Sequence, residues 1–293
     1  MTEGHSLEHL IALFDDPDEV VSACVDRSVM ELGEGVLDLL AARCARESDP
    51  LLRESIASHI ARYNTEFRLK ALAGLHRGPN FRASLYEGCF LAASLMDPAV
   101  NRNDFNAKLS VCTSEYHNEI SSGRTAVEDA QIFNHIFFHR MHFTMTDQEL
   151  RTERCALLPQ VLQSHRGNPF ALSLIYFTMA EEAGLPLYPM TFHGGFVPVW
   201  LEGAEELFCV NLLDHGALVS KKMLADSLRQ RGVPGSQDMR IRPASTVLSM
   251  YFESLSTLYS RSGNETRAAL AEKAIEALGA DRYLSPLSPD EED

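Results

Sequence analysis

The sequence predicts a mainly helical α+β fold, in which one central helix packs on a small antiparallel sheet between flanking helical segments. Apolar residues recur at helical spacing along most of the chain. The most hydrophobic predicted helix, residues 169–183, stops at Gly184-Leu185-Pro186, a helix end followed by a turn. Three short predicted strands follow it, with the turn sequence Glu202-Gly203-Ala204-Glu205 before the last; they are residues 187–190, 196–201 and 207–213.

Residues 1–78 are predicted to form a separate helical segment. Asp16-Pro17 and Asp49-Pro50 each combine an N-cap residue with a proline at the first helical position, and helically spaced apolar residues follow both pairs. Two such starts, about one helical repeat apart, are typical of a HEAT-like array. An ordinary helical bundle accounts for the same pattern equally well.

The rest of the chain is predicted to divide into a core at 79–235, a helical hairpin at 236–283 and an acidic tail at 284–293. The hairpin has a TPR-like pattern, with helices at 246–260 and 265–278 on either side of a short Ser-Gly-Asn connection. The tail ends in Asp-Glu-Glu-Asp, and we expect it to be solvated and disordered.

Composition excludes several functional classes. The formal net charge of −15 argues against a surface that binds nucleic-acid phosphates, since the basic clusters, Lys221-Lys222 and Arg229 to Arg231, are short. Six cysteines are scattered without a Cys-x-x-Cys pair, which is neither a zinc spacing nor a disulfide framework. The chain starts without a signal-peptide pattern and has no apolar run near the roughly 18 residues that cross a bilayer. We therefore expect a cytoplasmic protein that binds no membrane, nucleic acid or cofactor.

Three strings occur in order along the chain: Leu85-Tyr86-Glu87-Gly88-Cys89-Phe90-Leu91-Ala92, Phe133-Asn134-His135-Ile136-Phe137-Phe138 and Arg166-Gly167-Asn168-Pro169-Phe170-Ala171-Leu172-Ser173. Taken in this order and spacing, they resemble the SirB-one branch of the transglutaminase-like superfamily. Residues 85–92 are similar to the Glu-Gly-x-Phe-Leu helix of that branch, and residues 133–138 to its Leu-Asn-x-x-Leu-Phe segment. Residues 166–173, with Gly184-Leu185-Pro186 after them, resemble its Arg-Arg-Gly-x-Pro-x-x-Leu-Ser helix and terminal Gly-Leu-Pro. The resemblance extends over residues 80–280 and implies a transglutaminase-like core with helical flanks.

The resemblance also locates three catalytic positions. In active members a cysteine that opens the central helix is the nucleophile, a histidine on the next strand is the base, and an aspartate on the following strand orients it. These positions fall on Pro169, Gly195 and Asp214 here, so the nucleophile and the base are both missing. We therefore expect a protein that is not an enzyme.

The predicted function is that of a binding or regulatory module, because the resemblance implies a regulatory association for some relatives. The helical flanks or the vestigial groove would hold a protein or peptide partner. A helix N-terminus facing an acidic position is a natural pocket if the groove is open. The groove residues are Asn168, Pro169, His193, Gly195, Asp214 and His215. The sequence leaves the oligomeric state undetermined.

One alternative is a cysteine hydrolase or acyl transferase with a relocated nucleophile. Cys89 or Cys209 could serve with His193 and Asp214, because a strand would direct His193 to the same face as Gly195. The simpler interpretation, which we favour, is that both cysteines are small buried apolar residues.

A second alternative is a metal site. His135, His139 and His142 would share one face of a helix that extended so far, and imidazoles at i and i+4 can chelate Zn²⁺ or Ni²⁺. Phenylalanines lie between these histidines, so the simpler interpretation is a buried Phe stripe with a wetter His face. We expect no metal.

Overall fold

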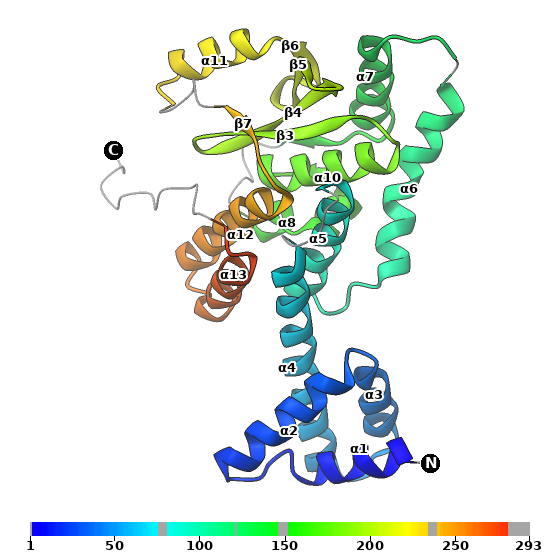
Figure 1. The fold of residues 1–293 in the computed structure, drawn as a ribbon, viewed down its shortest axis with the longest axis vertical. Coiled ribbons are helices and arrows are strands. Elements are labelled where there is room, and N and C mark those ends of the chain that lie inside the picture. Colours follow the sequence, from blue (N-terminus) through cyan, green and yellow to red (C-terminus); the bar gives the residue numbers. More distant parts are fainter. Residues whose placement is uncertain (1, 76–80, 121, 146–151, 234–238, 281–293) are drawn as a thin grey trace. The chain divides into compact units, whose positions relative to one another are not determined.

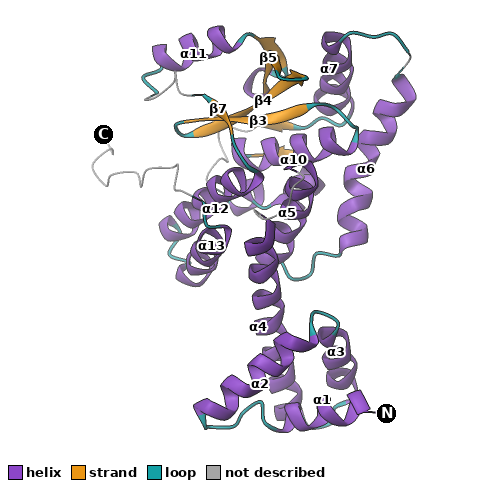
Figure 2. Cartoon of the chain, in the orientation of Figure 1, coloured by secondary structure: helices purple, strands orange, loops and turns teal. Residues whose placement is uncertain are grey.

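The computed structural model describes residues 2–75, 81–120, 122–145, 152–233 and 239–280 (Figure 1). The chain separates into two compact units, unit 1 (Met1–Ala71) and unit 2 (Leu72–Asp293). Helices predominate, and five of the described strands form one small sheet within unit 2 (Figure 2). The predicted α+β class is therefore confirmed.

Unit 1 is a helical bundle. Its helices are α1 (Thr2–Ala12), α2 (Glu19–Leu32), α3 (Val36–Arg46) and the first part of α4 (Pro50–Gly74). All four contribute to one cluster of buried side chains, in which Leu40 and Ile56 have no exposed surface. Arg62 and the Tyr63 hydroxyl both donate to Asp26 at 2.7 Å, which ties α4 to α2. The hydrogen bonds from Arg62 hold the pKa of Asp26 below its usual value.

One of the two predicted Asp-Pro helix starts is confirmed and the other is wrong. The Asp49 carboxylate accepts the N–H of Leu51 at 3.0 Å, with Pro50 at the first helical position. Helix α2 begins instead at Glu19, and its cap is Asp18. Asp16 accepts the N–H of Asp18 at 2.9 Å, so this carboxylate closes a turn that precedes the helix.

The helices of unit 2 surround α10 (Pro169–Glu182), which was predicted almost to the residue. Ten consecutive residues of α10, Ala171 to Ala180, are buried, which explains why its sequence has no polar face. The sheet packs on one side of α10 and helices pack on the other. The other helices of unit 2 are α5 (Phe81–Met96), α6 (Arg102–Glu119), α7 (Ala126–Asn134), α8 (Glu153–Ala156), α9 (Leu158–Ser164), α11 (Lys221–Gln230), α12 (Ala244–Arg261) and α13 (Glu265–Leu278).

The main sheet is antiparallel, with the strand order β6-β5-β4-β3-β7. All three predicted strands are present. Phe192 pairs with Gly195 across the first hairpin and Glu202 with Glu205 across the second. The strands are β3 (Leu187–Phe192), β4 (Gly195–Glu202), β5 (Glu205–Asn211), β6 (Ala217–Val219) and β7 (Arg240–Ile241); a separate parallel pair is β1 (Thr144–Met145) and β2 (Arg166–Gly167).

Alternate residues of β4 face opposite layers. Phe196 contacts the α10 rings of Phe170 and Phe177. Val197 and Val199 belong to a cluster that also contains Leu228 of α11. The sheet therefore lies between α10 and α11.

The helix predicted for residues 126–141 changes character at His135. A π-helix, η2 (His135–Arg140), follows α7, and the N–H of Met141 donates to the Ile136 carbonyl five residues earlier at 2.9 Å. The wider turn accompanies the burial of three consecutive side chains, Ile136, Phe137 and Phe138. His142 lies beyond the helix with a φ of 59°. The predicted helical face of three histidines is therefore wrong, and no group of three metal-ligating side chains occurs within the described ranges.

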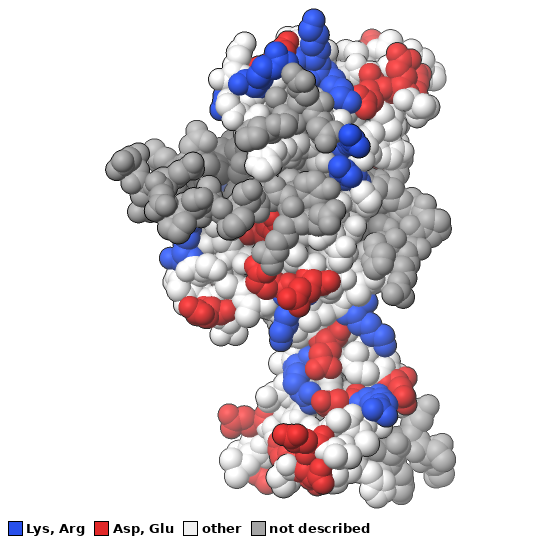
Figure 3. Space-filling model, turned by 60° about the vertical axis from the view of Figure 1, so that its left-hand side comes forward, with Lys and Arg blue, Asp and Glu red and all other residues white. Residues whose placement is uncertain are grey.

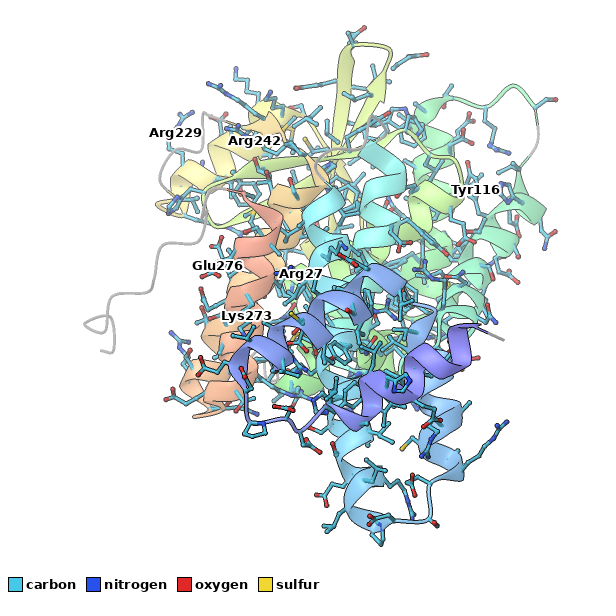
Figure 4. All side chains as sticks on the ribbon, turned by 60° about the horizontal axis from the view of Figure 1, so that its bottom comes forward. Arg27, Tyr116, Arg229, Arg242, Lys273 and Glu276 are labelled. Carbon is cyan, nitrogen blue, oxygen red and sulfur yellow. The ribbon has the colours of Figure 1, made fainter. Side chains whose placement is uncertain are left out.

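The C-terminal hairpin of α12 and α13 is confirmed as a pair of helices, and α12 also packs on α5. Lys273 and Glu276 lie on the exposed side of α13 (Figure 4). A TPR-like identity for this hairpin stays a prediction, and the predicted tail at 284–293 lies outside the described residues. None of the described helices has the length and apolar character required to span a bilayer.

Candidate functional site

The start of α10 is a tightly packed helix cap. The N–H of Asn168 donates to the Cys155 carbonyl at 2.7 Å, and its side-chain oxygen accepts the N–H of Ala171 at 2.9 Å. A Cβ on Gly167 would lie 2.8 Å from Cγ1 of Val161, so this position requires glycine. Asn168 is buried, and its role here is to begin the helix on which Pro169 stands.

A pocket of about 320 Å³ opens in front of this helix start. Pro169 and Gly195, which the sequence resemblance assigns to the nucleophile and base positions, both line it. The part of the predicted groove beside these two residues is thus an open pocket in the structure. The pocket wall is mainly apolar and is contributed by α10, the β3–β4 hairpin, the segment after β5 and α11; it includes Phe170, Ser173, Phe192, Leu213, Leu224, Leu228 and Arg231.

The base position has no room for an imidazole in this arrangement. A Cβ built on Gly195 would lie 2.9 Å from Cζ of Phe192 and 3.1 Å from its Cε2. The Phe192 ring, on the paired residue of β3, therefore occupies the space beside Gly195. A histidine at 195 would require this ring to move.

His193 lies apart from the pocket. It is exposed in the turn between β3 and β4, where Gly194 has a φ of 86°. The expectation that a strand would direct His193 to the face of Gly195 is wrong, because β3 ends at Phe192. The two-residue turn requires the backbone freedom of Gly194. The turn interrupts the alternation of side chains between the two faces of the sheet.

Asp214 and His215 belong to a second pocket, of about 450 Å³, whose lining also includes His135 and His139 of the π-helix. Asp214 lies in a short 3₁₀ helix, η3 (Leu212–Asp214), rather than on a strand, and both it and His215 are exposed. The predicted groove residues are therefore divided: Pro169 and Gly195 line the first pocket, while Asp214 and His215 line the second.

A buried hydrogen-bond network holds the segment between the two pockets. The Asn134 side chain donates to the Gly216 carbonyl at 2.7 Å and accepts from the Tyr176 hydroxyl at 2.7 Å. Gly216 has a φ of 86°, and a Cβ there would lie 2.4 Å from Cγ of Asn134. The network thereby fixes residues 211–216 against α10. Sequence reasoning missed it, although Asn134 within the mainly apolar 133–138 string was a usable signal.

The candidate relocated nucleophiles are both buried. Cys89 is in hydrogen-bond contact with the Thr178 hydroxyl at 3.2 Å, and burial raises the pKa of its thiol to about 12. Cys209, on β5, has no exposed surface, and burial raises the pKa of its thiol to about 11. Both thiols are therefore held in the neutral form, which is a poor nucleophile.

We expect this burial to be visible as selective thiol labelling. At about pH 8 a water-soluble disulfide reagent should modify Cys24, which is exposed, much faster than Cys89 or Cys209. Peptide mapping by mass spectrometry identifies the labelled residues, and urea-unfolded protein supplies the control in which all six react. Rapid labelling of Cys89 in the folded protein would contradict the expectation.

Sequence reasoning also missed the α11 wall of the pocket. Helix α11 is capped by Ser220, whose hydroxyl accepts the N–H of Met223 at 3.2 Å. Leu224 and Leu228, four residues apart, reach the pocket, and Arg231 follows the helix end. The serine cap and this spacing were the available signal.

Residues 103–248 match the transglutaminase-like superfamily, and the matched range contains α10, the sheet and both pocket walls. The chain thus contains a transglutaminase-like domain. It is also similar to F-box only protein 21 of Mus musculus, Pongo abelii and Homo sapiens, with 31% identity in each case over 72 residues. That stretch is 25% of this chain and spans 12% of those proteins. No solved structure matches the chain.

Proposed function

We propose that the transglutaminase-like domain is a non-catalytic binding module that takes an apolar side chain of a protein or peptide partner into the pocket beside Pro169. The observation that carries this proposal is an open, mainly apolar pocket at the position where active relatives carry out chemistry. A few polar groups on its wall, such as Ser173 and Asn211, would orient the bound chain.

The domain is proposed to be non-catalytic because of the residues at the three positions that the resemblance assigns to catalysis. Pro169 has no nucleophilic atom, and the Phe192 ring occupies the space beside Gly195. Asp214 lines the other pocket. A regulatory role follows naturally, because a domain that binds without turnover acts by occupying its partner.

The finer family assignment belongs to the same proposal. We place the chain in the SirB-one branch, with HEAT-like helices in unit 1 and a TPR-like hairpin in α12 and α13, acting in the cytoplasm. The helical punctuation of the N-terminal segment and the three quoted strings support this placement. A partner could bind to the helices of unit 1 or to the α12–α13 hairpin instead of the pocket, and this would also be a regulatory association.

The pocket is tested by placing a charge on its rim. Leu213 lines the pocket and is 61% exposed, so Leu213→Arg should leave the free energy of unfolding nearly unchanged. At about 0.5 M salt, where attraction between exposed charges is screened, peptides selected from a random display library on the full chain should lose at least about tenfold in affinity for Leu213→Arg, since the guanidinium would have to be desolvated beside apolar groups.

The matched control is Val111→Arg on α6, which adds the same charge at a 51% exposed apolar residue away from the pocket lining. It should bind the selected peptides as the unmodified chain does. Equal binding by the unmodified chain, Leu213→Arg and Val111→Arg would contradict the pocket as the binding site.

The hydrolase or transferase alternative has its own test. The full chain should neither hydrolyse a glutamine-containing peptide nor transfer its acyl group to an added amine, as measured by mass spectrometry. Turnover that is lost in Cys89→Ser or Cys209→Ser, but retained in Cys24→Ser, would establish the relocated nucleophile and overturn the proposal.

A further inference from the structure

We propose that the partner of this pocket is an acidic peptide segment, whose apolar side chain enters the pocket while a neighbouring carboxylate faces Arg231. The inference rests on the proposed function and adds the chemical class of the partner. It follows from the distribution of charge around the pocket, from the ion pairs already present there and from the mixed chemistry of the pocket wall.

The pocket lies beside a basic part of the chain. Residues 217–242 contain six lysines and arginines but only two aspartates, in a chain whose formal net charge is −15. Figure 3 shows lysine and arginine side chains gathered at the end of unit 2 that carries α11. A positive region on a strongly acidic protein attracts acidic partners and raises their rate of association.

The fold brings the two basic stretches of this segment to the same face of the sheet. Leu228 of α11 and Met239, which precedes β7, belong to one buried cluster with Met190, Val199 and Cys209 of the sheet. The cations on α11 and around β7 therefore border the same region, as the positions of Arg229 and Arg242 in Figure 4 also indicate.

Two cations in this region form no ion pair within the described part of the chain. Lys221 already pairs with Glu206 at 2.9 Å, and Arg229 pairs with Asp226 at 3.0 Å. Arg231 and Lys222 are exposed, and neither forms an ion pair with another residue of the described part of the chain. Arg231 also lines the pocket itself, so its guanidinium can meet a ligand whose apolar part is already held.

The pocket favours a peptide over other anions. A volume of about 320 Å³ with an apolar wall accommodates side chains rather than a bare phosphate or a metal ion. The N-terminus of α10, with Pro169 on the wall, adds a positive helix-dipole end to the same site. The acidic β4–β5 hairpin with Glu202 and Glu205 disfavours a long polyanion such as nucleic acid.

A selection followed by a charge series tests the inference. Random dodecapeptides are selected on the full chain, and the best binder is compared by fluorescence polarisation with a counterpart in which every Asp is Asn and every Glu is Gln. Enriched peptides should combine an apolar residue with nearby acidic residues. The acidic peptide should bind at least about fivefold more tightly than its neutral counterpart at low salt, and this advantage should shrink as salt is added.

Charge reversal identifies the cation. Arg231→Glu should weaken binding of the acidic peptide by about fivefold or more, and should weaken binding of the neutral counterpart by clearly less. The matched control Arg261→Glu makes the same change of net charge at an exposed residue of α12 outside the pocket lining, and should leave both peptides unchanged. Partial recovery of acidic-peptide binding in Arg231→Lys, relative to Arg231→Glu, would assign the effect to the charge of residue 231.

The outcomes separate this inference from the proposed function. If selected peptides share an apolar residue and lose binding in Leu213→Arg, but the neutral counterpart binds as tightly as the acidic one, the acidic class is overturned and the binding module stands. Equal losses in Arg231→Glu and Arg261→Glu also overturn it. If Leu213→Arg binds every peptide that the unmodified chain selects, the proposed binding module itself is overturned.

Discussion

Replacing Gly216 by alanine is expected to destabilise unit 2 by about 3 kcal/mol or more. The new Cβ would lie 2.4 Å from Cγ of Asn134, 2.6 Å from its Nδ2 and 2.7 Å from its Oδ1, and the backbone φ of 86° is unfavourable for any residue with a Cβ. Asn134 cannot move away without breaking its hydrogen bonds to the Gly216 carbonyl and the Tyr176 hydroxyl. Steric overlap, backbone strain and loss of the network therefore add.

The free energy of unfolding is measured by urea titration of Trp200 fluorescence. Trp200 is the only tryptophan of the chain, and it is buried on β4, so its signal reports unit 2. The control is Gly203→Ala, because Gly203 also has a positive φ, of 63°, but a Cβ there meets no atom within 4 Å. This control should cost only the backbone term of about 1 kcal/mol. Equal costs at the two positions would contradict the close approach at Gly216.

Replacing Asn134 by alanine should cost about 3 kcal/mol, because two buried groups then lose their partner. The Gly216 carbonyl loses its donor and the Tyr176 hydroxyl loses its acceptor. Tyr176→Phe removes only one of these hydrogen bonds, leaves the second bond of Asn134 in place and should cost about 1.5 kcal/mol. Trp200 fluorescence measures both changes in the free energy of unfolding.

A double-mutant cycle isolates the coupling within this network. In the Asn134→Ala, Tyr176→Phe double variant the orphaned hydroxyl is absent, so the combined cost should be lower than the sum of the single costs by about 1 kcal/mol. Additive costs would mean that the hydroxyl does not depend on Asn134. The network also bears on function, because Leu213 on the rim of the proposed binding pocket lies within the segment that Asn134 holds.

Local sequence signals predicted much of the fold. The buried run of residues 169–183 and its Gly-Leu-Pro stop predicted α10, and the turn sequence at 202–205 predicted the β4–β5 hairpin. These elements depend on neighbouring residues only: hydrophobic periodicity, caps and turns act over a few positions. The π-helix could not be predicted in this way, because the consecutive burial of Ile136 to Phe138 depends on residues that are distant in the sequence, including Tyr176.

The sequence by itself determined that proline and glycine stand at 169 and 195, the positions that the family resemblance assigns to the nucleophile and the base, since residue identity needs no coordinates. Only the tertiary structure decided that the groove beside them is open, that Phe192 covers Gly195 and that Asp214 faces another pocket. It alone also placed Arg231 on the wall of an apolar pocket. The physical reason is that a pocket is bounded by segments from α10, the β3–β4 hairpin and α11, whose approach is set by the packing of the shared core rather than by any local pattern.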